Sequence, residues 1–446
     1  MRHIRYWLRN CKTDNRSVTW LLISGYFFLC VLCFALLQIP LVQNEDISLV
    51  DHIFFTLSIV STTGLAPADF TATYNIWGQI ISLFFIQLGG IGYMALSSFI
   101  ILKDYVRLPK ISVQLLRMEF NLPQRYPLAQ FIYAIFVFTL LIEALGAVIL
   151  YIGFSQAGIE SPLWQAIFHS ISAFCTAGFS LFNDSMTSFQ DNDLIRWTIL
   201  ILSLLGSIGF IVLLDFWNKL RQKRRSITLT SKIILIGTFS LWIIAAFFLF
   251  ISDPNLYAKG WEGVQLAVFQ SISAHTTVGF NSYPLGELSL PAIFILINLM
   301  IVGASPAGTG GGIKTTSLTA IFAVLHAILR RKKRVTFLSR EIPASNIHLA
   351  ISTLVFYLLL MVVGSWLVLL YDSQRFGLAE ILFEVASALS TVGLSTGITS
   401  EFSAGSKIIL SLLMFIGRLG VLTFGFALIS RAPLLRAKPK VEDIAV

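Results

Sequence analysis

Long apolar stretches alternate with short polar segments along the whole chain. A helix needs about 20 apolar residues to cross the hydrocarbon layer of a bilayer, so each long stretch predicts a transmembrane helix. The pattern therefore predicts an all-α integral membrane protein with eight spans. These are Val18 to Val42, Trp77 to Leu102, Leu128 to Phe154, Leu194 to Trp217, Ile233 to Ile251, a run from Pro291, Ile347 to Tyr371 and Ile408 to Ile429.

The composition agrees with this class, because 56% of the 446 residues are hydrophobic and only 12% are charged. Basic residues concentrate before the first span and in the connections after the second, fourth and sixth. By the positive-inside rule, these segments and both termini are expected in the cytoplasm, in a protein of the cell membrane. The net charge of +9 does not predict nucleic-acid binding, because the basic residues flank spans rather than covering one soluble face.

The segments assigned to the outside hold few basic residues and more acidic ones. Acids there could concentrate cations near a pore mouth, and solvated loop surfaces would have the same composition. The acids concerned include Asp51, Asp69, Asp184 and Glu401.

Four short segments between the odd and even spans can be superimposed without gaps. Each ends in glycine, with Phe ten residues before the glycine, Ser six before and Thr two before. Three shared positions in four copies indicate an internal repeat. The segments are Phe54 to Gly64, Phe168 to Gly178, Phe269 to Gly279 and Phe383 to Gly393.

The repeat unit is a helix, a short segment and a second helix. Related glycine-bearing sequences recur in every second helix, at Gly89 to Gly92, Gly206 to Gly209, Gly303 to Pro306 and Gly417 to Gly420. The predicted organisation is a cytoplasmic N-terminus at 1–17, pore unit 1 at 18–105, unit 2 at 106–223, unit 3 at 224–333, unit 4 at 334–430 and a cytoplasmic C-terminus at 431–446.

Each short segment has only half the length of a bilayer crossing, and both its ends lie outside, so it must dip into the membrane and return. Non-helical backbone at membrane depth is tolerated only inside protein or around water, so four dips should surround one pore. Glycine lets carbonyl oxygens turn inward, and rings of carbonyls replace the water around a dehydrated cation. The expected cation-binding filter is Thr62, Thr63, Gly64, Thr176, Ala177, Gly178, Thr277, Val278, Gly279, Thr391, Val392 and Gly393.

These Thr-x-Gly sequences resemble degenerate forms of the Thr-Val-Gly-Tyr-Gly filter of potassium channels. Four such units in one chain, from Val18 to Ile429, resemble the Trk/Ktr/HKT superfamily of potassium transporters, and most of all the bacterial Ktr membrane subunit. The resemblance implies potassium uptake, with K⁺ at the filter carbonyls and Na⁺ as a candidate co-ion. Glycine in every filter goes with potassium preference in that superfamily. A sodium-preferring or weakly selective carrier is the alternative.

The resemblance also has implications for assembly and regulation. It implies a homodimer with two separate pores, no cofactor in the chain itself, and a cytosolic ring of nucleotide-binding regulatory subunits. Basic clusters at Lys219 to Arg225 and Arg330 to Arg334 are candidate docking sites for that ring. Charge that sets membrane topology explains the same residues.

The third unit departs from the pattern, because a glycine-rich segment with a proline interrupts its second span. A phosphate-binding loop is excluded, since Ile313 separates Gly312 from Lys314 and no strand precedes the segment. We expect a flexible plug below the filter, and the resemblance implies an intramembrane gating loop at 303–314. The expected gating residues are Gly303, Ala304, Ser305, Pro306, Ala307, Gly308, Thr309, Gly310, Gly311, Gly312, Lys314 and Arg418.

Arg418 lies in the last span, where a charge costs about 2.5–3.5 kcal/mol on insertion scales and should face protein or water. The repeat places it just inward of the filter, which favours a pore-facing role. A structural salt bridge to Glu143, the other ionisable residue expected deep in a span, is the alternative, and the two roles are compatible.

Two histidines lie within the repeated segments. His169 and His275 lie nine and four residues before their glycines, so packing is favoured over a shared metal site or proton relay. An intramembrane enzyme needs clustered acids, histidines or a nucleophile at membrane depth, and Glu143 and Arg418 alone do not supply them. We therefore expect a transporter without enzymatic activity.

Overall fold

A computed structural model of the chain describes residues 15–93, 95–96, 98–99, 110–120, 122, 126–221 and 227–429. Most of the predicted N-terminal segment 1–17, the unit boundaries at 105 and 223, and the C-terminal segment 431–446 lie outside the described residues. The unit boundaries therefore stay predictions.

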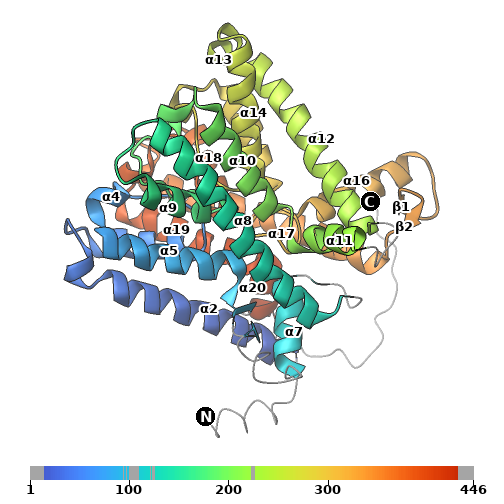
Figure 1. Cartoon of the computed structure of the whole chain (residues 1–446). Coiled ribbons are helices and arrows are strands. Elements are labelled where there is room, and N and C mark those ends of the chain that lie inside the picture. Colours follow the sequence, from blue (N-terminus) through green and yellow to red (C-terminus); the bar gives the residue numbers. More distant parts are fainter. Residues whose placement is uncertain are drawn as a thin grey trace, which may run out of the picture.

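Four long apolar helices form the first spans of the four predicted units (Figure 1). In the most apolar window of each, no more than 33% of the residues are buried in the protein. Apolar helices with so much exposed surface are stable in hydrocarbon, so these four predicted spans are confirmed. They are α2 (Asn15–Leu37), α8 (Leu128–Gln156), α12 (Leu229–Ser252) and α17 (Ala344–Asp372).

A shorter helix follows each long one and ends just before the repeated Thr-x-Gly sequence. Local sequence explains where these helices start. The Ser48 side chain caps the first by accepting from Asp51 N, and Pro162 occupies the first turn of the second. We call them the re-entrant helices, and they are α3 (Leu49–Val60), α9 (Pro162–Phe174), α14 (Trp261–Thr276) and α18 (Leu378–Leu389).

The second span of the third unit is interrupted as predicted, but in the other units the second helix is not the continuous span that the sequence predicts. The stretches Leu194 to Trp217 and Ile408 to Ile429 are each two helices, bent by 92° and 97°, so the prediction of unbroken spans there is wrong. In the first unit the helix ends at Ile91. The elements are α5 (Ile76–Ile91), α10 (Asp193–Ser207) with α11 (Phe210–Leu220), α15 (Leu290–Ile301) with α16 (Thr315–Leu329), and α19 (Ala404–Leu419) with α20 (Val421–Ile429).

The breaks have one local cause. Gly92, Gly209 and Gly420 end or separate the helices with φ of +88°, +91° and +87°, a backbone conformation that only glycine adopts without strain. We call them the hinge glycines. In units 1, 2 and 4 the last glycine of the recurring sequence is therefore the signal for a bend.

Short elements connect these helices. A hairpin of two antiparallel strands projects from one edge, away from α2 and α5, which lie side by side (Figure 1). The short elements are η1 (Pro40–Val42), α4 (Phe70–Thr73), α7 (Lys110–Glu119), η2 (Thr187–Phe189), α13 (Pro254–Ala258), η3 (Leu285–Glu287), β1 (Thr336–Phe337), β2 (Arg340–Glu341) and η4 (Thr399–Glu401).

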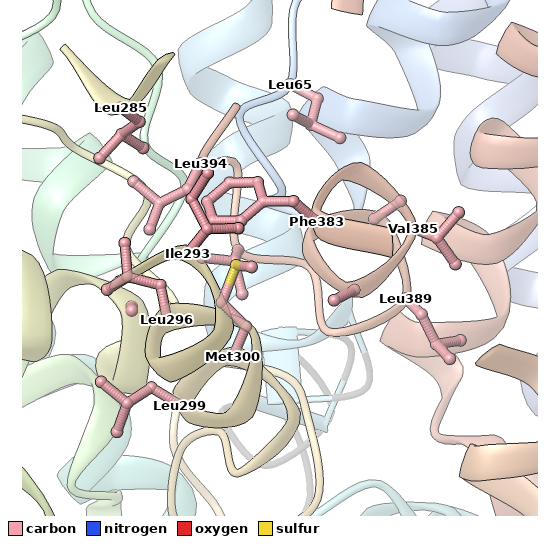
Figure 2. Close-up of a cluster of buried hydrophobic side chains, with 14 of the residues drawn as sticks. Leu65, Leu285, Ile293, Leu296, Leu299, Met300, Phe383, Val385, Leu389 and Leu394 are labelled. Carbon is pink, nitrogen blue, oxygen red and sulfur yellow. The ribbon is translucent and has the colours of Figure 1, made fainter. Parts of the chain in front are cut away.

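The apolar interior packs around the re-entrant helices. Figure 2 shows one cluster in which Leu394, just after α18 and its glycine, lies among Ile293 of α15, Leu285 and Phe383. Leu65 follows the first repeat's glycine and belongs to the same cluster. The all-α membrane fold with four tandem helix, re-entrant segment and helix units is thus confirmed.

Candidate cation pathway

All four re-entrant helices end in the same way. The threonine two residues before each glycine takes a left-handed conformation, with φ of +53°, +51°, +59° and +52° along the chain. The next residue's amide then donates back to the carbonyl of the shared serine, for example Thr63 N to Ser58 O at 2.8 Å and Val392 N to Ser387 O at 2.8 Å. One backbone turn, repeated four times, therefore brings the chain out of each helix.

The shared serine also holds the backbone segment that follows the turn. Ser58 Oγ and Ser387 Oγ accept from Gly64 N and Gly393 N at 3.1 and 3.0 Å. Ser172 Oγ donates to Phe179 O at 2.8 Å, and Ser273 makes the equivalent bond in the third repeat. The serine found in every repeat thus ties the backbone around the glycine to the re-entrant helix.

The four glycines form a closed ring. Each has a positive φ, from +66° to +94°, and a Cβ placed on it would collide with the carbonyl oxygen of the residue before the next repeat's glycine. Gly64 lies against Ala177 O, Gly178 against Val278 O and Gly279 against Val392 O. Gly393 then lies against Thr63 O, so the fourth repeat returns to the first. We call this arrangement the glycine ring, and it brings together all the predicted filter residues.

Two side chains hold the segments that follow the glycines of the second and fourth repeats, which we call the outer segments. His169 Nε2 lies 3.1 Å from Ser180 Oγ and accepts from Leu181 N at 3.3 Å. Glu384 stands at the same offset before its glycine, and its carboxylate accepts from Ser395 Oγ at 2.6 Å and from Thr396 N at 3.0 Å. These two residues therefore form equivalent clamps on the outer segments.

The clamp residue Glu384 was not recognised in the sequence. Its side chain is fully buried in α18, so the expectation that Glu143 and Arg418 are the only deep ionisable residues is wrong. The available signal was its register, because Glu384 and His169 both precede their glycines by nine residues. The packing role expected for His169 is also incomplete, because its ring forms hydrogen bonds to Ser180 and Leu181 in the segment after the glycine.

The second helices pack closely on the ends of the re-entrant helices. A Cβ on Gly89 would collide with Val60 O, one on Gly206 with Phe174 O and one on Gly417 with Leu389 O. Each of these oxygens belongs to the last residue of a re-entrant helix. In units 1, 2 and 4 the first glycine of the recurring sequence is therefore required by a backbone contact with the end of a re-entrant helix, whereas Gly303 of unit 3 lies against Gly311 O of the loop.

The intramembrane loop, residues 303–314, lies against this inner side of the ring. Thr176 Oγ1 donates to Thr309 Oγ1 at 3.1 Å, and Gly311 N donates to Thr277 Oγ1 at 3.1 Å. A Cβ on Gly311 would also collide with Thr391 Oγ1. The loop thus reaches the threonines of three repeats, while Lys314 Nζ folds back onto Gly310 O at 2.7 Å.

Arg418 joins this loop to the first repeat. Its guanidinium donates to Thr309 O in the loop and to Gly89 O in α5. The alternative salt bridge to Glu143 is not formed, because Glu143 accepts from Gln87 Nε2 at 3.1 Å and Arg418 bonds to backbone carbonyls. Arg418 therefore lies beneath the ring, between the third and first repeats.

A cavity of about 710 Å³ opens on the inner side of the loop. Gly310 and Gly312 of the loop, Lys314 and Arg418 line it, together with Glu119 of α7. In the structure the loop and Arg418 thus separate this inner cavity from the glycine ring.

The outer acids are engaged in local structure. Lys407 Nζ donates to Asp51 Oδ1 at 2.7 Å, which joins α19 of the last repeat to α3 of the first. Asp69 caps α4, and Glu401 pairs with Arg375 at 3.5 Å. Asp184 accepts from Ser188 N at 2.8 Å. These contacts favour structural roles over a free acidic lining.

Comparisons with known proteins agree with this architecture. The chain is 33% identical over 411 residues to Ktr system potassium uptake protein B of Vibrio alginolyticus, covering 91% of this chain and 90% of the relative. It is 31% identical to the potassium/sodium uptake protein NtpJ of Enterococcus hirae, covering 96% of both chains. The crystal structure of the potassium transporter TrkH from Vibrio parahaemolyticus matches with a TM-score of 0.76 at 20% identity, over 96% of this chain and 87% of that one. Residues 35–433 match the TrkH model of cation transport proteins, and the chain therefore belongs to the TrkH family.

Proposed function

We propose that this chain takes up potassium across the cytoplasmic membrane through the glycine ring. The observation that carries the proposal is the closed ring of four positive-φ glycines, each packed against a carbonyl oxygen of the next repeat. The relative from Vibrio alginolyticus is named as a potassium uptake protein. The basic residues beside the spans support an orientation with both termini in the cytoplasm.

The ring supplies what a dehydrated cation needs. Carbonyl oxygens at the Thr-x-Gly turns replace water around the ion, so K⁺ would bind at these carbonyls. The four re-entrant helices point their C-terminal ends at the ring, and the partial negative charge there attracts a cation. Thr62 Oγ1 and Thr391 Oγ1 are buried and have no protein partner among the described residues, which leaves them available to an ion or its water.

We propose potassium preference, and a sodium-preferring or weakly selective carrier is the alternative. Glycine in all four repeats supports potassium preference, while the preceding residue differs between repeats and lowers the fourfold symmetry of the ring. The relative from Enterococcus hirae is named as a potassium/sodium uptake protein, so Na⁺ is a candidate second ion or co-ion.

The intramembrane loop and Arg418 would act as the gate. They lie between the glycine ring and the inner cavity, and Arg418 adds a positive charge on the path of a cation. Opening requires the loop to leave Thr176 and Thr277 and Arg418 to release Gly89 O. Glycine-rich backbone is suited to such a movement, because it has few side chains to repack.

Potassium-dependent growth tests the transport function directly. The chain should restore growth at low potassium to a host that lacks its own uptake systems, whereas an empty vector should not. Tracer uptake with competing sodium then separates a potassium-selective protein from a weakly selective one. A membrane-inserted chain that restores neither growth nor uptake would refute the proposal.

A soluble partner would regulate this gate. Arg330 to Arg334 form an exposed basic segment after α16 and suit an acidic docking surface, while part of the cluster Lys219 to Arg225 lies outside the described residues. We propose a homodimer of this chain bound to a cytosolic ring of nucleotide-binding subunits.

Reconstituted flux tests this partner. The chain alone should show leak flux that ATP and ADP do not change, and the cognate soluble subunits should make flux nucleotide-dependent. Neutralising Arg330 to Arg334 should weaken that dependence and leave ion selectivity intact, whereas the outer-side control Lys259→Gln should change neither. A nucleotide response by the chain alone would contradict the proposal.

A further inference from the structure

In three repeats, the long helix forms a hydrogen bond to the re-entrant helix near the last turn of that re-entrant helix. Tyr357 of α17 places its hydroxyl 2.5 Å from Ser390 Oγ, at the end of α18. Trp242 Nε1 of α12 donates to His275 Nδ1 at 3.1 Å, in the last turn of α14. The long helices therefore contact the re-entrant helices through directed polar bonds as well as apolar packing.

The second repeat has the equivalent contact. Cys175 Sγ, at the end of α9, lies 3.8 Å from Glu143 Oε1 of α8 and 3.4 Å from Gln87 Oε1 of α5. Glu143 also accepts from Gln87 Nε2 of α5 at 3.1 Å, so this contact extends to the first repeat. In the first repeat, Ser61 bonds instead to Thr63 at 2.6 Å, within the turn itself.

The three contacts occupy equivalent positions in their repeats. Glu143, Trp242 and Tyr357, which we call the buttress residues, stand 35 to 37 residues before the glycine of their own repeat. Their partners stand three or four residues before the same glycine. All three side chains are buried, with exposed fractions of 6%, 7% and 1%, on helices that otherwise face mostly outward.

An apolar residue would fill each of these positions without the cost of burying a polar group. A buried hydrogen bond adds direction, because it holds its partner at one distance and angle. The hydrogen-bond partners Cys175, His275 and Ser390 lie one or two residues before the Thr-x-Gly turns. The bonds to them therefore influence how far these turns stand from the axis of the glycine ring.

We propose that the buttress residues are positioning residues that hold the glycine ring open and thereby set its preference for potassium over sodium. The inference rests on the proposed function of that ring. Carbonyls that replace the hydration shell of K⁺ must stand further from the axis than carbonyls that suit the smaller Na⁺. Releasing a re-entrant helix from its buttress lets the ring contract and favours the smaller ion.

Removing one hydroxyl group tests the inference. The variant Tyr357→Phe keeps the ring of the side chain and loses the bond to Ser390. We expect the preference for potassium over sodium to fall about three- to tenfold, the change that the loss of one buried hydrogen bond produces. The control Tyr371→Phe alters the same helix at an exposed position, and its selectivity should equal that of the native chain.

A double-mutant cycle tells positioning from general destabilisation. Ser390→Ala should lower the preference by the same factor, and the double variant Tyr357→Phe with Ser390→Ala should lower it no further. Additive losses would overturn the inference, because they would mean that the two residues act separately.

The readout is tracer uptake of potassium in the presence of increasing sodium, normalised to the protein inserted. Native selectivity in Tyr357→Phe would overturn the inference. If that variant did not insert, Trp242→Phe, which loses the bond to His275, would decide in the same assay. A native chain that took up no potassium would refute the proposed function itself. Uptake by the native chain is measured first, so this failure is distinguished from a failure of the inference about the buttress residues.

Discussion

Replacing Gly64 with serine should weaken discrimination between potassium and sodium. Gly64 has a φ of +94°, and a Cβ there would collide with Ala177 O and lie 3.1 Å from the backbone of Gly178. Both neighbours are backbone atoms of the next repeat, so no flexible side chain can move aside. The substitution must strain Gly64 or displace a carbonyl of the ring.

The size of the effect follows from the backbone. A residue held in a sparsely populated φ/ψ region costs about 1–3 kcal/mol. An energy of that size corresponds to a factor of about 5 to 150 in an equilibrium constant. If the chain relieves the strain by moving Ala177 O, ion binding loses that energy, so we expect at least about a fivefold fall in potassium preference.

A second glycine separates backbone strain from the collision. Gly158 also has a positive φ, +70°, but a Cβ there would have no neighbour within 4 Å. The control Gly158→Ser therefore has comparable strain without a displaced carbonyl, and its selectivity should be native. The assay is tracer potassium uptake with competing sodium. Native selectivity in Gly64→Ser, or equal losses in both variants, would refute the role of the ring.

One deletion and two substitutions test the gate and the outer clamp. Deleting Ala304 to Gly312 should raise flux severalfold in the same assay, because the deletion removes the contacts to Thr176 and Thr277; a correctly inserted deletion with native flux would contradict gating. Arg418→Gln should also raise flux, since the loop loses its bond through Thr309 O and a positive charge leaves the path; reduced flux at normal insertion would argue against a barrier. Glu384→Ala should lower potassium affinity several-fold in concentration-dependent uptake by releasing the outer segment, whereas unchanged affinity would remove the clamp.

Much of the architecture could be read from local patterns. The four long helices were predictable because a run of apolar residues has one stable environment, the bilayer. The recurrence of Phe, Ser, Thr and Gly identified the four turns, and the structure gives each shared residue a place. The phenylalanines are fully buried, the serines hold the turn, and the threonines and glycines take positive φ.

Other features do not follow from hydropathy or from identical repeated residues. The hinge glycines at 92, 209 and 420 lie within apolar runs, and hydropathy counts such runs as continuous even where the helices bend by 92° at Gly209 and by 97° at Gly420. Glu384 was hidden for a similar reason, because the repeat was defined by identical residues, whereas His169 and Glu384 share a register and a task but no chemistry.

The sequence by itself determined the membrane class, the four units and the residues that form each turn, because these depend on contacts between near neighbours in the chain. The tertiary structure alone decided that Gly393 lies against Thr63 O and closes the ring, and that Arg418 bonds to Gly89 O rather than to Glu143. Residues 329 positions apart meet in the second contact. Hydropathy and repeat spacing describe one helix or turn at a time, whereas these contacts depend on how the four units pack around a common axis.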